Sequence, residues 1–142
     1  MQRRDAIQQL ALGLTGLALS SKLSAQAEVA KAPSGKSLLD ALSQCQVDAV
    51  RCQAHCVKLL EGKDTSIMGC FTKVSDLIDL NHAALSLVSR DSPAAKDLAA
   101  VLKKSADACA QECSKHAKHH ELCAACEKAC VALVKSIAAT YA

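Results

Sequence analysis

The chain of 142 residues has few of the residues that make turns or stacked contacts. Phe71 and Tyr141 are its only aromatic residues, and tryptophan is absent. Five glycines and two prolines are too few for the turns that a fold of many short strands requires. Hydrophobic residues nevertheless make up 51% of the chain. A core of leucine, alanine, valine and cysteine predicts narrow helices that pack closely.

Two classes of function are disfavoured by what is missing. Lysine and arginine are mixed with acidic residues throughout and form no basic block, so nucleic acid is not an expected partner. We find no nucleophile–base–acid constellation, phosphate-binding loop or carboxylate pair, so an enzyme is not expected. His55 and Cys56 are adjacent, but adjacent residues on a helix point in different directions, which argues against a thiol enzyme.

The N-terminal 27 residues have the three-part layout of an export signal. A short first segment carries Arg3 and Arg4, residues 10–19 form an apolar run, and residues 25–27 are small enough for a cleavage site. The apolar run is too short to span a membrane, and no later segment approaches that length. We therefore expect residues 1–27 to be removed, leaving a soluble mature protein without a membrane segment.

The arginine pair favours the twin-arginine route, which would place the protein in a bacterial periplasm. Gln2 and Ala6 stand where that motif usually has a serine and an aromatic residue, so the general secretory route stays open as an alternative.

Residues 37–142 are expected to form four helices, after a flexible linker at residues 28–36. From Leu38 onward, apolar residues recur in steps of three and four, the spacing of a helix seam. Short connections predict an all-α, up-down-up-down four-helix bundle. The expected boundaries are Gly62 as a stop, Thr65 or Ser66 as the next N-cap, a break at Arg90-Asp91 followed by Ser92-Pro93, and a turn from Lys115 to His120.

Nine cysteines fall on the inward stripes of these helices. Three pairs are four residues apart, which places both sulfurs of a pair on one helix face. Up-down-up-down topology brings eight of the nine toward one pole of the bundle, with Cys45 deeper. The nine are Cys45, Cys52, Cys56, Cys70, Cys109, Cys113, Cys123, Cys126 and Cys130. The opposite half is expected to be apolar, with Leu38, Leu42, Leu85 (or Ala84), Val88, Leu98 (or Ala99), Leu102, Leu133 and Ile137.

Several uses for inward thiols stay open at this point. Exported cysteines usually pair as disulfides, but nine is odd, and side chains four apart on a helix lean in parallel. Structural zinc often uses Cys-x2-Cys spacing, found here only at Cys123/Cys126, and iron–sulfur clusters usually take thiolates from loops. Cu(I) prefers thiolate and thioether ligands. A disulfide-type redox protein and a zinc- or cadmium-sequestering protein remain the alternatives to a Cu(I)-binding protein.

Other soft or borderline ligands map to the same pole as the thiols: His55, Met68, His116, His119 and His120. They form a candidate entry region above the buried cysteines, with ordinary helix-end residues as the alternative. His82 lies toward the other half, where a surface histidine is expected.

Four segments carry the cysteines in a distinctive spacing: CQVDAVRCQAHC at 45–56, MGC at 68–70, EC at 112–113 and LCAACEKAC at 122–130. This spacing resembles that of the copper storage proteins. The resemblance implies a cysteine-lined four-helix bundle, exported by the twin-arginine route, that stores or buffers multiple Cu(I) ions. It implies binding mostly between Cys-x3-Cys thiolates, with His55, Met68, His116 and His120 at the open pole.

By spacing, members richer in cysteine carry it where this chain has Asn81, Ala106, Leu133 and Ile137. We therefore expect a reduced capacity, roughly four Cu(I) ions at two thiolates each. This capacity suits a buffer or carrier that exchanges copper with another protein. Association of the bundle with copies of itself stays open.

Overall fold

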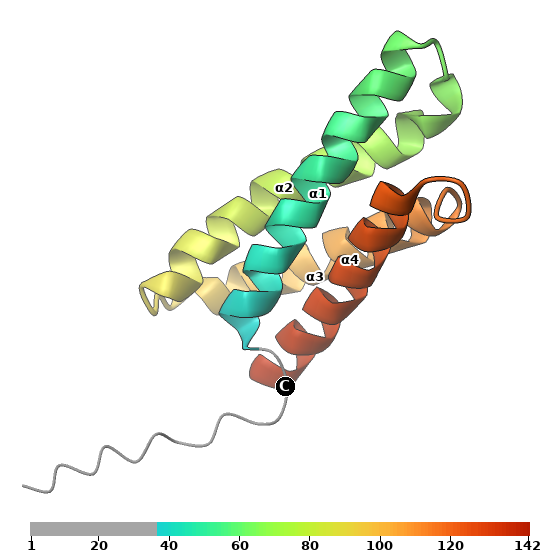
Figure 1. Cartoon of the computed structure of the whole chain (residues 1–142). Helices are drawn as coiled ribbons and strands as arrows, with labels where there is room; N and C mark the ends of the chain where they lie inside the picture. Colours follow the sequence, from blue (N-terminus) through green and yellow to red (C-terminus); the bar gives the residue numbers. More distant parts are fainter. Residues whose placement is uncertain (1–36) are drawn as a thin grey trace, which may run out of the picture. The chain divides into compact units, whose positions relative to one another are not determined.

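The computed structural model describes residues 37–142, which form four α-helices and one short 3-10 helix (Figure 1). The expected signal at 1–27 and linker at 28–36 lie outside the described residues. The elements are α1 (Leu38–Glu61), η1 (Thr65–Ile67), α2 (Met68–Ser89), α3 (Ala94–Ser114) and α4 (Glu121–Thr140). Between Ser37 and Ala142 there is no β-strand, which confirms the all-α prediction.

The helices form the predicted up-down-up-down bundle. Each helix contacts its neighbours in sequence, and α1 also contacts α4, which closes the ring (Figure 1). This order brings together the end of α1, the start of α2, the end of α3 and the start of α4. We call this end of the bundle the thiol pole. None of the helices in residues 37–142 is long and apolar enough to cross a membrane.

The ends of α1 and α2 are closed in the same way. After α1, Lys63 adopts a left-handed conformation (φ 67°), and the amide of Asp64 donates to the Leu59 carbonyl at 2.9 Å. After α2, Asp91 does the same (φ 51°), and the amide of Ser92 donates to the Leu87 carbonyl at 2.9 Å. These bonds satisfy carbonyls that a helix end leaves open. The stop predicted at Gly62 is in the right place, although Lys63 makes the turn.

Two predicted N-caps are wrong in detail. Neither Thr65 nor Ser66 caps α2, because Asp64 accepts from the amide of Ser66 and starts η1 one turn earlier. A short acidic side chain at this position can satisfy amides that would otherwise start the helix unpaired. At the start of α3, Pro93 already has helical backbone angles. The backbone carbonyl of Ser92 accepts a hydrogen bond from the amide of Ala95, and no side chain caps this helix.

The core divides into a thiol half and an apolar half, as predicted. Leu42, Leu102 and Leu133 are buried in the apolar half, with Ile137 close to the end of α4. The small alternatives Ala84 and Ala99 are the buried ones, and Leu85 and Leu98 pack half-buried around them. Leu38 and Val88 are also only half-buried. Small residues on the inward stripe let the helices approach closely, which moves the larger leucines to the flanks.

Candidate metal centre

All nine cysteines are free thiols, and the side chain of each is fully buried. They lie on the inward stripes of the four helices, because steps of three and four residues keep one helix face turned toward the core. The thiols are not confined to the thiol pole, because two of them lie deeper in the bundle. Cys130 is the tenth of the 20 residues of α4, and Cys45 is the eighth of the 24 residues of α1.

The sulfur atoms form a network that crosses between helices. Cys70 on α2 contacts Cys52 on α1 at 3.7 Å and Cys113 on α3 at 3.6 Å. Cys52 also lies 3.9 Å from Cys123 on α4, and Cys109 lies 4.0 Å from Cys126. The sequence left Cys70 without a partner on its own helix, and the structure supplies partners on both neighbouring helices.

Contacts within a helix are no shorter than those between helices. Cys109 and Cys113 are 4.0 Å apart, as are Cys126 and Cys130. The expectation that copper sits mostly between residues four apart therefore describes only part of the arrangement. Cross-helix pairs offer sulfurs at equal or smaller spacing.

Three groups of three sulfurs lie within 4.8 Å of one another. They share members, because Cys52 and Cys126 each belong to two groups. The three groups, which we call triads, are Cys52/Cys56/Cys70, Cys52/Cys113/Cys126 and Cys109/Cys126/Cys130. Shared thiolates are the ligands expected to bridge neighbouring soft metal ions, so the triads form one continuous array.

The sulfur spacing fits a metal ion with little rearrangement. With a metal–sulfur bond of about 2.3 Å, two thiolates are about 3.8 Å apart around a tetrahedral ion, about 4.0 Å around a trigonal ion and about 4.6 Å around a linear one. The Sγ–Sγ contacts of 3.6–4.0 Å match the first two geometries. A linear site needs two sulfurs to separate by about 0.6 Å from the longest contact.

Hydrogen bonds among the thiols shift their pKa values in opposite directions. The contact with Cys113 raises the pKa of both Cys52 and Cys70, and the contact with Cys109 raises the pKa of Cys126 and Cys130. Donation from neighbours, Cys109 first, lowers the pKa of Cys113. Donation from Cys52 first likewise lowers the pKa of Cys123. A metal ion that binds the sulfurs as thiolates must therefore displace protons from the thiols whose pKa is raised.

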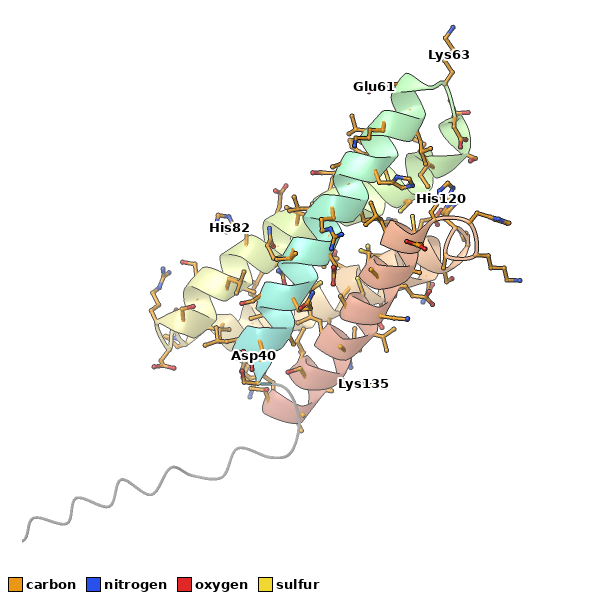
Figure 2. The ribbon with its side chains drawn as sticks, viewed as in Figure 1. Asp40, Glu61, Lys63, His82, His120 and Lys135 are labelled. Carbon is orange, nitrogen blue, oxygen red and sulfur yellow. The ribbon has the colours of Figure 1, made fainter. Side chains whose placement is uncertain are left out.

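The structure brings together two of the predicted histidines at the thiol pole. A nitrogen of His55 on α1 lies 3.0 Å from a nitrogen of His120, which directly precedes α4. His116 lies in the turn after α3, and its ring centroid is 6.4 Å from that of His120. Figure 2 shows His120 at the end of the bundle that carries Glu61 and Lys63.

Met68, the first residue of α2, is at the same pole but 48% exposed. His119 is exposed, and so is His82 on α2, which confirms the surface reading for His82.

Three polar residues near the thiols were not singled out as functional from the sequence. Asp48 on α1 is almost fully buried and accepts a hydrogen bond from Gln44 at 2.9 Å. Asp64 accepts hydrogen bonds from Ser66, which lower its pKa, and His120 and His116 are near enough to add to that effect when protonated. Glu112 packs against Gly69 of α2. For the Glu112 contact, the one signal in the sequence was Gly69 itself, a glycine in the first turn of a helix.

Asn81 is the polar residue at the boundary between the two halves, and it is fully buried. Its amide nitrogen donates to the Leu42 carbonyl at 2.9 Å and to Gln46 Oε1 at 2.8 Å. Its Oδ1 atom has no hydrogen-bond partner, which costs roughly 1–3 kcal/mol for a buried acceptor. An amide here pins α2 to α1 but adds no soft ligand.

The chain is similar to proteins built on the same plan. The family profile described as Csp, copper storage protein, matches residues 31–141. The uncharacterized cysteine-rich protein YhjQ of Bacillus subtilis (strain 168) is 30% identical over 105 residues, covering 70% of this chain and 95% of that protein.

Two solved structures share the fold. Cu(I)-bound copper storage protein BsCsp3 matches with a TM-score of 0.68 and 27% identity, over 74% of this chain and 95% of its own. Apo-Csp3 from Bacillus subtilis matches with a TM-score of 0.65 and 25% identity, over 75% of this chain and 97% of its own. The buried thiol array, the four-helix bundle and the match over residues 31–141 together show that this chain belongs to the copper storage protein family.

Proposed function

We propose that this protein stores or buffers several Cu(I) ions between thiolates in the core of its bundle. The observation that carries this proposal is the array of buried sulfurs, with contacts of 3.6–4.0 Å between helices and within them. Buried, closely spaced thiolates are soft ligands that suit Cu(I), which accepts low coordination numbers. The Cu(I)-bound BsCsp3 structure, at 27% identity, supports the same cargo.

The proposed ligands are the nine cysteines. The triads contain seven of them, Cys123 contacts Cys52, and Cys45 extends the array toward the apolar half. His55, Met68, His116 and His120 are proposed as ligands of the mouth, where copper enters and leaves. Their position above fully buried sulfurs supports this role, since an ion reaching the core must pass the ends of the helices.

A buffering or delivery role fits this chain better than bulk storage. The inward positions Asn81, Ala106, Leu133 and Ile137 carry no soft ligand, and all four are buried. Metal is therefore expected in one half of the bundle only. We propose that the protein acts without catalysing a reaction and exchanges copper with a donor or acceptor protein, with self-association as a further property to test.

The export route is part of the proposal. Nine thiols exported unfolded would meet an oxidising compartment exposed, whereas twin-arginine export delivers a folded protein whose thiols are already buried. We therefore propose a periplasmic protein with a twin-arginine signal at residues 1–27. Replacing both Arg3 and Arg4 by lysine should hold the precursor in the cytoplasm, measured by cell fractionation. Unchanged export would point to the general secretory route.

Metal competition tests the proposed function. The sulfur spacing of 3.6–4.0 Å also fits tetrahedral zinc, so geometry alone does not select the ion. Anaerobic protein is titrated with Cu(I), Zn(II) and Cd(II), each against a chelator of matched strength. We expect Cu(I) to bind in several equivalents and to displace the other two. Preferential retention of zinc or cadmium would replace the proposal with a sequestration role for that metal.

The disulfide alternative is tested by counting thiols. The closest sulfurs are 3.6 Å apart, well beyond the roughly 2.05 Å of a disulfide bond. Protein purified without oxygen should give nine titratable thiols, all lost on adding Cu(I). A count of one or three in freshly folded protein would identify a disulfide-bonded protein instead.

A further inference from the structure

Gly69, the second residue of α2, makes room for a carboxylate from the neighbouring helix. A Cβ atom at this position would lie 2.5 Å from Oε1 of Glu112 and 2.9 Å from its Cδ atom. Glycine weakens a helix, so its presence in the first turn of α2 calls for a reason. The reason supplied by the structure is that the Glu112 carboxylate occupies the space of the missing side chain.

The two carboxylate oxygens of Glu112 face different partners. Oε2 accepts a hydrogen bond from Lys115, which directly follows α3. Oε1 lies 3.8 Å from Nε2 of His116, too far for a hydrogen bond. The His116 and Glu112 side chains are only 15% and 19% exposed, and the His116 Nε2 atom is shielded from solvent with no hydrogen-bond partner. A buried ring nitrogen without a partner therefore lies next to a carboxylate whose other oxygen is already bonded to Lys115.

We propose that Glu112 is a positioning residue that orients His116 for copper entry, and that Gly69 provides its seat. Closing the gap to about 2.9 Å needs a shift of about 0.9 Å, within reach of side-chain rotation. The bond makes Nε2 the N–H donor and leaves Nδ1 with the free lone pair, the form in which a histidine binds a metal ion. Carboxylate partners commonly fix ligand histidines in this way.

This inference rests on the proposed function, in which His116 is a ligand of the mouth. A purely structural role for Glu112 is the competing account, because a carboxylate beside the first turn of α2 also complements the helix dipole. The two accounts differ in what Gly69→Ala does. Alanine is the better helix former, so it should preserve or raise the stability of α2 while displacing the carboxylate.

The kinetic test uses Glu112→Ala, Glu112→Gln, Gly69→Ala and the double variant Gly69→Ala/Glu112→Ala. Stopped-flow transfer of Cu(I) from a coloured chelator complex gives the rate of uptake, and an endpoint titration gives the capacity. We expect Glu112→Ala and Gly69→Ala each to slow uptake about tenfold without changing capacity. The double variant should be no slower than either single one, because both changes remove the same carboxylate. Glu112→Gln, which keeps an acceptor oxygen, should recover most of the rate.

A measurement without copper separates this inference from the proposed function. In metal-free protein, ¹⁵N NMR of the imidazole should show His116 in the Nε2–H form, with that population falling in Glu112→Ala and in Gly69→Ala. Wild-type uptake rates in Glu112→Ala, additive effects of the two single changes, or an unchanged His116 spectrum would each overturn the inference. Failure of the core to bind Cu(I) would instead overturn the proposed function, with the NMR result unaffected.

Discussion

Cys52 should matter more for copper capacity than Cys56, its neighbour one turn along α1. Cys52 belongs to two of the three triads, whereas Cys56 belongs to one. Cys52→Ser therefore leaves only Cys109/Cys126/Cys130 intact, and Cys56→Ser leaves two triads. If each triad holds at least one Cu(I), the first variant loses about twice as many ions as the second.

The two variants are matched in their cost to folding. Both cysteines are fully buried on the same face of α1, so each serine places one hydroxyl in the core. A buried hydroxyl lowers the free energy of unfolding by about 1–3 kcal/mol. The loss is at the lower end of this range if the hydroxyl donates to the backbone carbonyl four residues earlier. At about 4–8 °C per kcal/mol, both variants should lose a similar amount of thermal stability and remain helical at 25 °C.

The assay is an anaerobic Cu(I) titration against a chelator, run beside circular dichroism of the metal-free proteins. Equal capacity losses in two folded variants would refute the reasoning from shared triads. We expect the metal-free wild-type protein to be folded, because packing rather than metal holds the bundle together. If it were unfolded, the bundle would depend on its metal for folding, as a zinc finger does, and this wider argument would be refuted.

Three further outcomes are expected. Leu133→Cys places a thiol near Cys130 on the inward stripe of α4 and should raise copper capacity in the titration, whereas an unchanged capacity would count against an extendable array. Leu102→Ala, in the apolar half, should lower the free energy of unfolding by about 3–5 kcal/mol in urea melts and leave capacity unchanged, since Leu102 is 1% exposed and its side chain supplies no metal ligand. Cu(I) affinity should fall as pH falls from 8 to 6, because the raised pKa values of Cys52, Cys70, Cys126 and Cys130 mean that binding displaces protons; a pH-independent affinity contradicts this.

The helices and the faces they bury were predictable from the sequence. Steps of three and four residues define one stripe per helix, and a break as clear as Ser92-Pro93 locates the third helix to within two residues. Single caps were harder to predict. Asp64 rather than Thr65 or Ser66 starts the segment before α2, because several polar residues in a row compete for the same amides.

Contacts between helices were the part that the sequence did not predict. The stripes placed Cys52 and Cys70 at one pole, but their 3.7 Å contact depends on how far α2 is shifted along α1. That shift is set by packing and by polar contacts such as Asn81 with Leu42, which no spacing within one helix reveals. The seat of Glu112 against Gly69 was hidden for the same reason.

Histidine positions show the same limit. α3 ends at Ser114, and His116 lies half-buried in the turn predicted to follow it, but the sequence did not show that His116 faces Glu112. The pairing of His55 with His120 depends on two segments 65 residues apart. Sequence placed these residues at the correct pole without showing which of them touch.

The location of bound copper is the most direct test of the account. A crystal of the Cu(I)-loaded protein, measured at the copper absorption edge, gives anomalous peaks at the metal positions. We predict several peaks among the sulfurs of Cys52, Cys70, Cys113 and Cys126 and none between Leu42, Leu102 and Leu133. Copper found only on surface histidines such as His82 or His119, with the core sulfurs free, would contradict the account.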